Sequence, residues 1–450
     1  MFDLMKKVYI WSILFEPLLL FTIGTAAVTG IGVNIGRLFQ LLFIVMFIVM
    51  FLTKKYPIRI FNPANPIYSP YLIYFSYAVF ISVIGVIIGS YTLQVQSIAD
   101  IDYSSFGGFS RSLYVRPFIE FIISFYYFLY YVVAPKYLLR NSRDIDYFFK
   151  AFHFVFVLFI FFGVVDLVFA AFDYSWIPRQ LNYDNYSNVG FRFHSFAGEP
   201  RDAFVYLMFG ASIYLLGNYW NTKIKVTRYG LILIIVLLVL TKSGSGVLGL
   251  FMSAGLIAIY GVLSGSRKML LISILTVFIL FLIIYALSLT PRLQLYVSVI
   301  QELYVVLDAG GTIPLHIQGQ MPNIYPLWEL YQNMRNWNPL PLLFGSGAGT
   351  SPIVNSNLGN YTDLSNPHSQ VVRTLYEFGL IGLMLFIFAF VTPVRRLTMN
   401  VSNNKKRMFL FIIIFLISAF LAHRSLLLYI YLGLFIAVFS QKMAADNSKF

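Results

Sequence analysis

The chain has 450 residues, of which 59% are hydrophobic and 11% are charged, and its net charge is +14. A soluble domain carries about 25% charged residues, so this composition excludes a soluble globular protein and predicts an all-α polytopic membrane protein. The absence of cysteine excludes disulfides, a thiolate nucleophile and metal centres with cysteine ligands.

About twelve apolar segments follow one another along the chain, most of them close to the ~20 residues that a bilayer span requires. They predict a single integral membrane domain, residues 1–450, and we recognise no internal repeat in it. The expected spans are 8–27, 35–53, 71–90, 116–138, 147–172, 202–220, 229–241, 244–263, 269–290, 370–392, 407–422 and 426–441.

The basic residues divide between the two sides that these spans define, because lysine and arginine concentrate at the cytoplasmic ends of membrane helices. With both termini cytoplasmic, the cytoplasmic loops are short and hold most of the 32 basic residues, including nearly all the lysines. Membrane insertion therefore explains the net charge, and no nucleic-acid partner is expected. The outward basic residues are mainly arginines and run against this bias: Arg37, Arg111, Arg116, Arg179, Arg192, Arg201, Lys242, Arg292, Arg335, Arg373 and Arg424.

Three outward loops are longer than tight turns, at about 91–115, 173–201 and 291–369. Loops as long as the last of these are usually functional or structured. Within it, residues 293–307 and 324–334 have helical apolar spacing, which predicts short helices at the membrane interface.

The loop 173–201 is rich in arginine and carries Arg179, Arg192 and Arg201 together with His194 and Glu199. The guanidinium group suits bidentate contact with phosphate oxygens, so this loop predicts an anionic ligand on the outward side. The alternative is that individual arginines pair with neighbouring carboxylates.

His368 is the best candidate for proton transfer, because its ordinary pKa lies near neutrality and it stands where the chain enters a span. A structural, hydrogen-bonded role is the alternative. In the turn 241–246, Lys242 either holds a phosphate or remains in water. The acidic residues expected inside spans are proton-relay candidates, although we prefer pairing with an arginine such as Arg37, Arg116 or Arg424: Glu16, Glu120 and Asp166.

No metal-binding motif and no glycine loop for nucleotide phosphates occurs in the sequence, so no metal and no cofactor is expected. A synthetic reaction would then need a substrate that is already activated.

Several motifs resemble the O-antigen polymerase and O-antigen ligase superfamily of bacterial membrane glycosyltransferases. The segment Asn366-Pro367-His368-Ser369, followed by Leu375-x-Glu377-x-Gly379-Leu-Ile-Gly382, is similar to its signature. Phe344-Gly-Ser-Gly-Ala-Gly349, Thr241-Lys-Ser-Gly244 and the spacing of Arg179 and Gly190 are also similar. Gly198-Glu199-Pro200 and Ser369 resemble the polymerase branch, whereas Lys242 departs from the arginine expected near that turn.

The resemblance implies a lipopolysaccharide biosynthesis enzyme of the bacterial inner membrane with a periplasmic active site. It would transfer a glycan from undecaprenyl diphosphate to a second lipid-linked repeat unit, with inversion and without metal; a chain-length regulator is a candidate protein partner. His368 would be catalytic, Glu199, His194, Glu377 and Gly190 would support the site, and the diphosphate would be held by Arg179, Arg192, Arg201, Arg335, Arg373 and Lys242. The alternatives are a ligase that transfers the glycan to lipid A–core, and a membrane transporter or lipid-oligosaccharide flippase.

Overall fold

A computed structural model of the chain describes residues 2–18, 34–53, 65–92, 115–172, 192–197, 200–222, 228–263, 324–351, 369–423 and 425–447, and the single positions 271, 274, 302, 305, 306 and 309. The regular elements within these ranges are all helical, as the composition predicts. They are α1 (Phe2–Phe15), α3 (Ile35–Leu52), α4 (Ser69–Thr92), α6 (Arg116–Tyr127), η1 (Phe128–Val133), α7 (Ala134–Leu138), α8 (Ser142–Ala170), η3 (Ser195–Ala197), α9 (Pro200–Trp220), α10 (Arg228–Leu240), α11 (Gly244–Leu263), α15 (Ile324–Arg335), α16 (Leu340–Phe344), α18 (Gln370–Leu397), α19 (Asn403–Ala422) and α20 (Leu427–Asn447).

The expected spans overlap these helices wherever the structure describes them, although α1 covers only the first part of 8–27. Residues 19–27 lie outside the described residues, as does 269–290 apart from two positions. In the part of the chain that the structure describes, four helical stretches are long and apolar enough to cross a membrane. They are Ile35–Leu52, Pro117–Leu138, Ser142–Ala170 and Gln370–Leu397. The chain is therefore a helical membrane protein, and the count of twelve spans stays a prediction. In the loop 291–369, α15 confirms the helix expected at 324–334, whereas 293–307 lies mostly outside the described residues.

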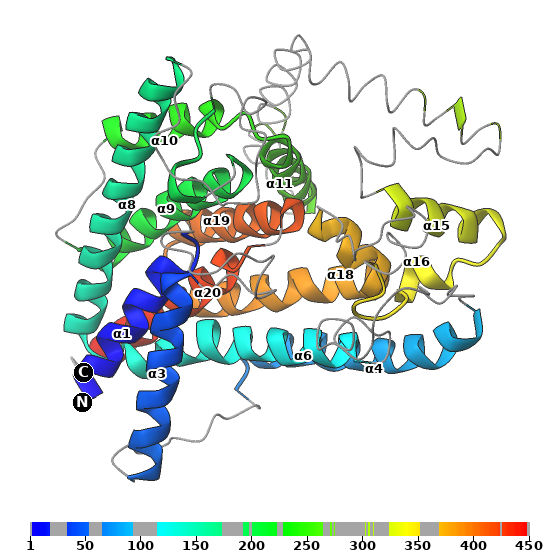
Figure 1. The fold of residues 1–450 in the computed structure, drawn as a ribbon. Coiled ribbons are helices and arrows are strands. Elements are labelled where there is room, and N and C mark those ends of the chain that lie inside the picture. Colours follow the sequence, from blue (N-terminus) through cyan, green and yellow to red (C-terminus); the bar gives the residue numbers. More distant parts are fainter. Residues whose placement is uncertain are drawn as a thin grey trace.

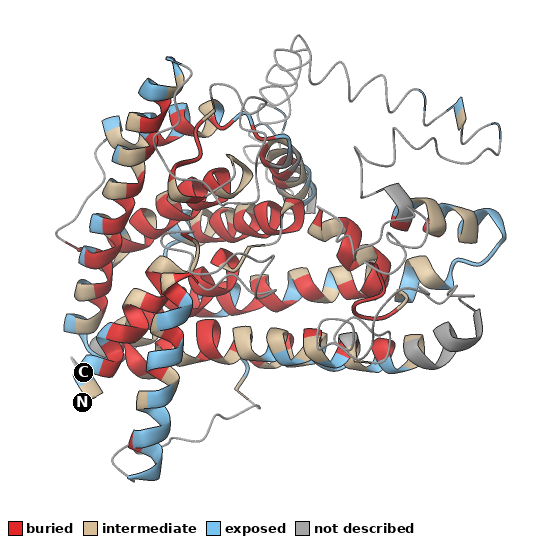
Figure 2. Cartoon of the chain, in the orientation of Figure 1, coloured by how far each residue is buried: buried red, intermediate tan, exposed pale blue. Residues whose placement is uncertain are grey.

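The surface of α3 shows the apolar exposure that a lipid-facing helix requires. Leu41, Val45 and Ile48 lie on one face of this helix and are exposed, and Leu52 is 72% exposed. Figure 2 shows this exposed face along most of α3. In water such a face is costly, but in a bilayer its neighbours are acyl chains.

α6, η1 and α7 form one continuous helical rod, in which the wider π-helical turn η1 displaces backbone carbonyls from their regular partners. The carbonyl of Tyr130 in η1 accepts a hydrogen bond of 2.6 Å from the hydroxyl of Tyr9 on α1. The hydroxyl of Tyr130 lies 2.6 Å from that of Ser12. These buried polar groups are thus hydrogen-bonded to each other, as an interior away from water requires.

α4 packs against α18 and also contacts α6, where the ring of Phe75 lies against those of Phe121 and Phe125 (Figure 1). Polar contacts join several helix ends into two groups, which we call poles. At one pole Lys6 Nζ is 2.6 Å from Asp144 Oδ2, which joins the starts of α1 and α8. Trp220 at the end of α9 donates to Asp146, and Lys442 at the end of α20 donates to a carbonyl of the last turn of α9. We call this end the Lys-rich pole. The helix ends at this pole are those that the distribution of basic residues predicts to be cytoplasmic.

The opposite pole joins the starts of α9 and α18 to the end of α19. His423, after the last residue of α19, lies 2.5 Å from Asp202 in the first turn of α9. Ser369, directly before α18, donates to the carbonyl of Leu421 at 3.4 Å. We call this end the Arg-rich pole, because its members are helix ends that the sequence predicts to face outward.

A break in α18 at Gly379 gives the outer part of this helix its special form. Gly379 has φ 68° and ψ −173°, so the helix is interrupted there. The carbonyls of Tyr376 and Glu377 instead accept hydrogen bonds from the amides of Ser346 and Gly347, at 2.9 and 2.8 Å. Irregular backbone is tolerated inside a membrane protein when other protein groups satisfy it in this way.

Glycine is required on both sides of this contact. A Cβ atom at Gly379 would lie 2.3 Å from the carbonyl oxygen of Leu343, and one at Gly345 would lie 2.4 Å from that of Glu377. Both residues also have a positive φ, which side chains disfavour. The glycines of the segment Gly345–Gly349, which we call the glycine loop, thus allow it to pack directly on the backbone of α18.

Candidate functional site

A cavity of about 260 Å³ lies where α4, α6 and α18 meet the end of α1 and the starts of α3 and α20. Its charged residues come from near the ends of α1, α3, α6 and α18. They are Glu16 directly after α1, Arg37 in the first turn of α3, Glu120 in the second turn of α6, and Arg373 and Glu377 in the first two turns of α18.

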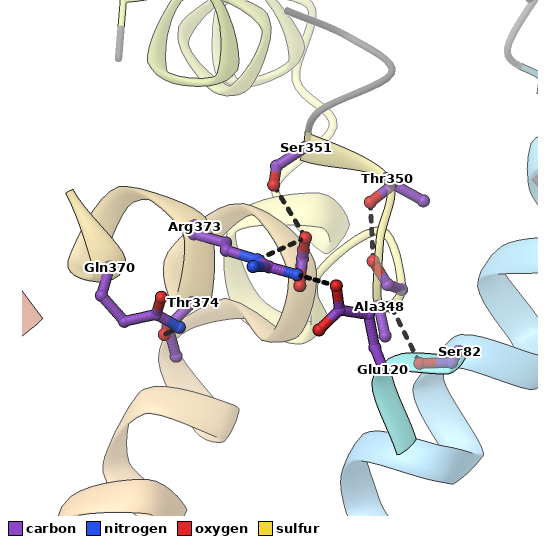
Figure 3. Close-up of polar contacts among 10 residues, drawn as sticks. Ser82, Glu120, Ala348, Thr350, Ser351, Gln370, Arg373 and Thr374 are labelled. Atoms are coloured by element: carbon purple, nitrogen blue, oxygen red, sulfur yellow. Dashed lines mark hydrogen bonds and ion pairs between the residues drawn. The ribbon is translucent and has the colours of Figure 1, made fainter. Parts of the chain in front are cut away.

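Arg373 is the centre of a buried ion-pair network (Figure 3). Its Nη2 lies 3.0 Å from Glu120 Oε1 and its Nε lies 3.1 Å from Glu377 Oε1, and the three side chains are at most 8% exposed. The hydroxyl of Ser351 donates to the same oxygen of Glu377 at 2.7 Å. Helical spacing explains the second pair, since residues four apart share one face of a helix.

The glycine loop is attached to α4 as well as to α18. The amide of Ala348 donates to Ser82 Oγ at 2.9 Å, and Thr350 Oγ1 donates to the carbonyl of Gly347 at 2.6 Å (Figure 3). This position brings Ser351, which follows the loop, onto the network of Arg373. The loop therefore forms one wall of the cavity.

A second ion pair lies at the other side of the cavity. Glu16 Oε1 is 3.7 Å from Arg37 Nε, and its Oε2 accepts from Gln40 Nε2 at 2.8 Å. The side chain of Arg37 is 48% exposed, whereas that of Glu16 is 7% exposed. The expected pairing of Glu16 with an arginine is confirmed, and Glu120 also pairs with an arginine, namely Arg373.

The large loop 291–369 is tied to α18 through α15. The hydroxyl of Tyr376 donates to Glu329 Oε2 at 2.9 Å. Burial raises the pKa of Glu329, and the hydrogen bond from Tyr376 opposes this rise. Tyr376 lies about one helical turn after Arg373 on α18. The hydrogen bond from Tyr376 therefore holds the Glu329 carboxyl close to the network of Arg373.

The turn between α10 and α11 is joined to the loop that precedes α9. Arg192 Nε donates to the carbonyl of Thr241 at 3.0 Å, and its Nη2 donates to that of Lys242 at 2.9 Å. The side chain of Lys242 is exposed. Two residues that the resemblance assigns to diphosphate binding therefore lie together at the Arg-rich pole.

His194 is buried against α8 in a closed arrangement. Its Nε2 lies 2.8 Å from Asp166 Oδ2, with the two side chains 1% and 3% exposed, and its Nδ1 lies 3.0 Å from the carbonyl of Ser195. This geometry fixes the segment 192–197 on α8, which fits a supporting role for His194. Asp166 is thus paired with His194, and its expected pairing with an arginine stays a prediction.

The remaining expected site residues are separate or outside the described residues. Arg201 is in the first turn of α9, and Arg335 is exposed in the last turn of α15. The structure brings Arg373 together with Glu377, and Arg192 together with Lys242. The expected residues that lie outside the described part are Arg179, Gly190, Glu199 and His368.

Sequence reasoning did not assign Gln370 and Ser351 to the site, although both belong to it. The sequence could have indicated Gln370, because it precedes Arg373 and Glu377 by three and seven residues and so shares their helix face. No pattern in the sequence indicates Ser351, since its contact with Glu377 depends on how the glycine loop folds.

Comparison of the sequence with models of known protein families and with curated proteins finds no match. The fold is that of a helical membrane protein. Its candidate site is a cavity lined by charged residues near the ends of several helices.

Proposed function

We propose that the chain is a bacterial membrane glycosyltransferase that polymerises a surface polysaccharide. It would transfer a glycan from undecaprenyl diphosphate to a lipid-linked repeat unit at the periplasmic face of the inner membrane. The observation that supports this proposal most is the contact between two distant motifs of the resemblance. The glycine loop (Gly345–Gly349) docks on Tyr376–Gly379, and Arg373 and Glu377 line the cavity beside it.

In the proposed reaction a hydroxyl oxygen of the acceptor sugar attacks the anomeric carbon of the donor sugar, on the face opposite the diphosphate. His368, two residues before Gln370 of the cavity, takes the hydroxyl proton. The new C–O bond forms as the bond to the diphosphate breaks, so the configuration inverts. The leaving group is undecaprenyl diphosphate, which needs no further cofactor.

The structure modifies the role that the resemblance gives to Arg373. Its guanidinium is already paired with Glu120 and Glu377, so we assign it to positioning rather than to direct binding of diphosphate. Arg192, Arg201 and the exposed Lys242 keep the binding role, because cations near the departing diphosphate lower the barrier to its release. Arg179 and Arg335 keep it as sequence-based assignments.

The size of the cavity limits which part of the substrate it can hold. Pockets for drug-sized ligands measure about 300–1,000 Å³, and this cavity is about 260 Å³. It therefore accommodates a sugar or a diphosphate but not a whole lipid-linked repeat unit. The polyprenyl chains would remain in the bilayer.

The proposal is tested by reconstituting the purified chain in vesicles with a lipid-linked repeat unit and separating the products by length. The wild type should form long glycans, whereas His368→Ala should leave single repeat units. His153→Ala is the matched control, because His153 bonds to Tyr214 away from the cavity and should not affect length. Long glycan from His368→Ala would remove the histidine from the mechanism. Transfer to added lipid A–core without polymerisation would identify a ligase.

A transporter is the second candidate, because three carboxylates line the cavity. Glu120 and Glu377 lie 3.0 and 3.1 Å from nitrogens of Arg373, which favours a fixed charge network over a titrating carrier at these two carboxylates. Movement of labelled lipid-linked repeat unit across vesicles, without transfer, would support the transporter instead.

A further inference from the structure

The charges of the cavity do not suit a diphosphate. Its lining residues, within the described part of the chain, include three carboxylates and only two guanidinium groups. Arg373 is already paired with two of these carboxylates, and Arg37 lies beside the third. An entering diphosphate would therefore find no net positive charge among the described lining residues.

The cavity instead offers neutral and acceptor groups with spare hydrogen-bonding capacity. Within the described part of the chain, the amide of Gln370 makes one long bond, of 3.4 Å, to Thr374 Oγ1. Arg373 and Ser351 both bond to Oε1 of Glu377, so that among the described residues its second oxygen is still able to accept. A carboxylate and a carboxamide together bind hydroxyl groups well, because they accept and donate in the same place.

Aromatic rings line the same cavity. Tyr74 and Phe75 come from α4, and Phe121 and Tyr127 come from α6. Ring faces pack against apolar C–H groups, which a pyranose presents on the faces of its ring. The volume of about 260 Å³ limits the occupant to one or two such rings.

We infer that this cavity is the subsite for an uncharged sugar of the acceptor repeat unit, with Glu377 and Gln370 as its specificity-determining contacts. The diphosphates of both lipid carriers bind outside it, at the Arg-rich pole. This inference rests on the proposed function, whose substrate class it narrows to repeat units that present a neutral sugar to the acceptor site.

Binding of free sugars to the full chain in lipid nanodiscs tests the inference without turnover. The probes are glucose, galactose, mannose, rhamnose and N-acetylglucosamine, compared with cationic glucosamine and inorganic pyrophosphate, and the measurement is saturation-transfer NMR. At least one neutral sugar should bind, and pyrophosphate should not displace it. Gln370→Ala and Glu377→Gln should each weaken that binding about tenfold, which corresponds to one lost hydrogen bond of this class.

Gln441→Ala near the end of α20 is the control and should bind as the wild type does. Gln370→Ala also covers the case in which Glu377→Gln fails to fold. Binding of no neutral sugar to folded wild type, or displacement of the bound sugar by pyrophosphate, would overturn the inference. Sugar binding without polymerisation would refute the proposed function, and with it the acceptor role, while leaving a neutral-sugar site in the cavity. Polymerisation without sugar binding would support the proposed function and overturn the inference.

Discussion

Replacement of Arg373 by methionine tests the buried network most directly, because it removes one cation and leaves two carboxylates. Arg373, Glu120 and Glu377 are at most 8% exposed, and the two ion-pair distances are 3.0 and 3.1 Å. Removing one partner from a buried ion pair costs about 3–5 kcal/mol, because the remaining charge is left without compensation. We expect Arg373→Met to reduce the free energy of unfolding by at least that amount.

The free energy of unfolding can be measured by titrating sodium dodecyl sulfate into mixed micelles and following helical circular dichroism. Arg335→Met is the matched control, since Arg335 is exposed in α15 and its loss should change stability by less than about 0.5 kcal/mol. The triple variant Arg373→Met/Glu120→Gln/Glu377→Gln carries no charge at this site and should regain most of the loss. A loss below about 1 kcal/mol for Arg373→Met alone, or no recovery in the triple variant, would refute the reasoning.

Three further predictions concern backbone geometry, a buried histidine and pH. Gly379→Ala should cost at least about 1–2 kcal/mol of unfolding free energy, because φ there is positive and a Cβ would clash; Gly255→Ala, which has open space, should cost nothing. Asp166→Ala should cost about 1–3 kcal/mol by leaving a ring nitrogen of His194 without an acceptor, and a double-mutant cycle with His194→Ala should give less than the sum. Burial raises the pKa of Glu329 above 4.5, so the folded chain retains a proton that the unfolded chain loses. Stability should therefore fall as pH rises from about 4.5 through the folded value, and Glu329→Gln should abolish this fall in unfolding midpoints.

The positions of the helices could be predicted from the sequence because membrane helices are marked by their apolar length. Where the structure describes the chain, the expected segments and helices agree, and the helix ends separate into the Lys-rich and Arg-rich poles. The break in α18 could not be predicted from hydropathy, since Gly379 lies inside the segment 370–392, which as a whole reads as one span. The need for glycine at this position becomes clear only from the close packing of the segment 343–349 against it.

The candidate site could be predicted in part. Arg373 and Glu377 were selected as functional residues, and they do line the cavity. Their partners Glu120 and Ser351 are on distant segments, and no spacing in one sequence indicates which arginine a buried carboxylate will meet. The same limit applies to Asp166, because no spacing in the sequence indicates its contact with His194.

The interruption at Gly379 also divides α18 mechanically. The amides that complete the backbone of its outer segment come from the glycine loop, and α15 holds the same segment through Tyr376. The turns before Gly379 are thus anchored to the glycine loop and to α15 as well as to the rest of their own helix. A displacement of those two segments would therefore move Arg373 and Glu377 with them, with Gly379 as the hinge.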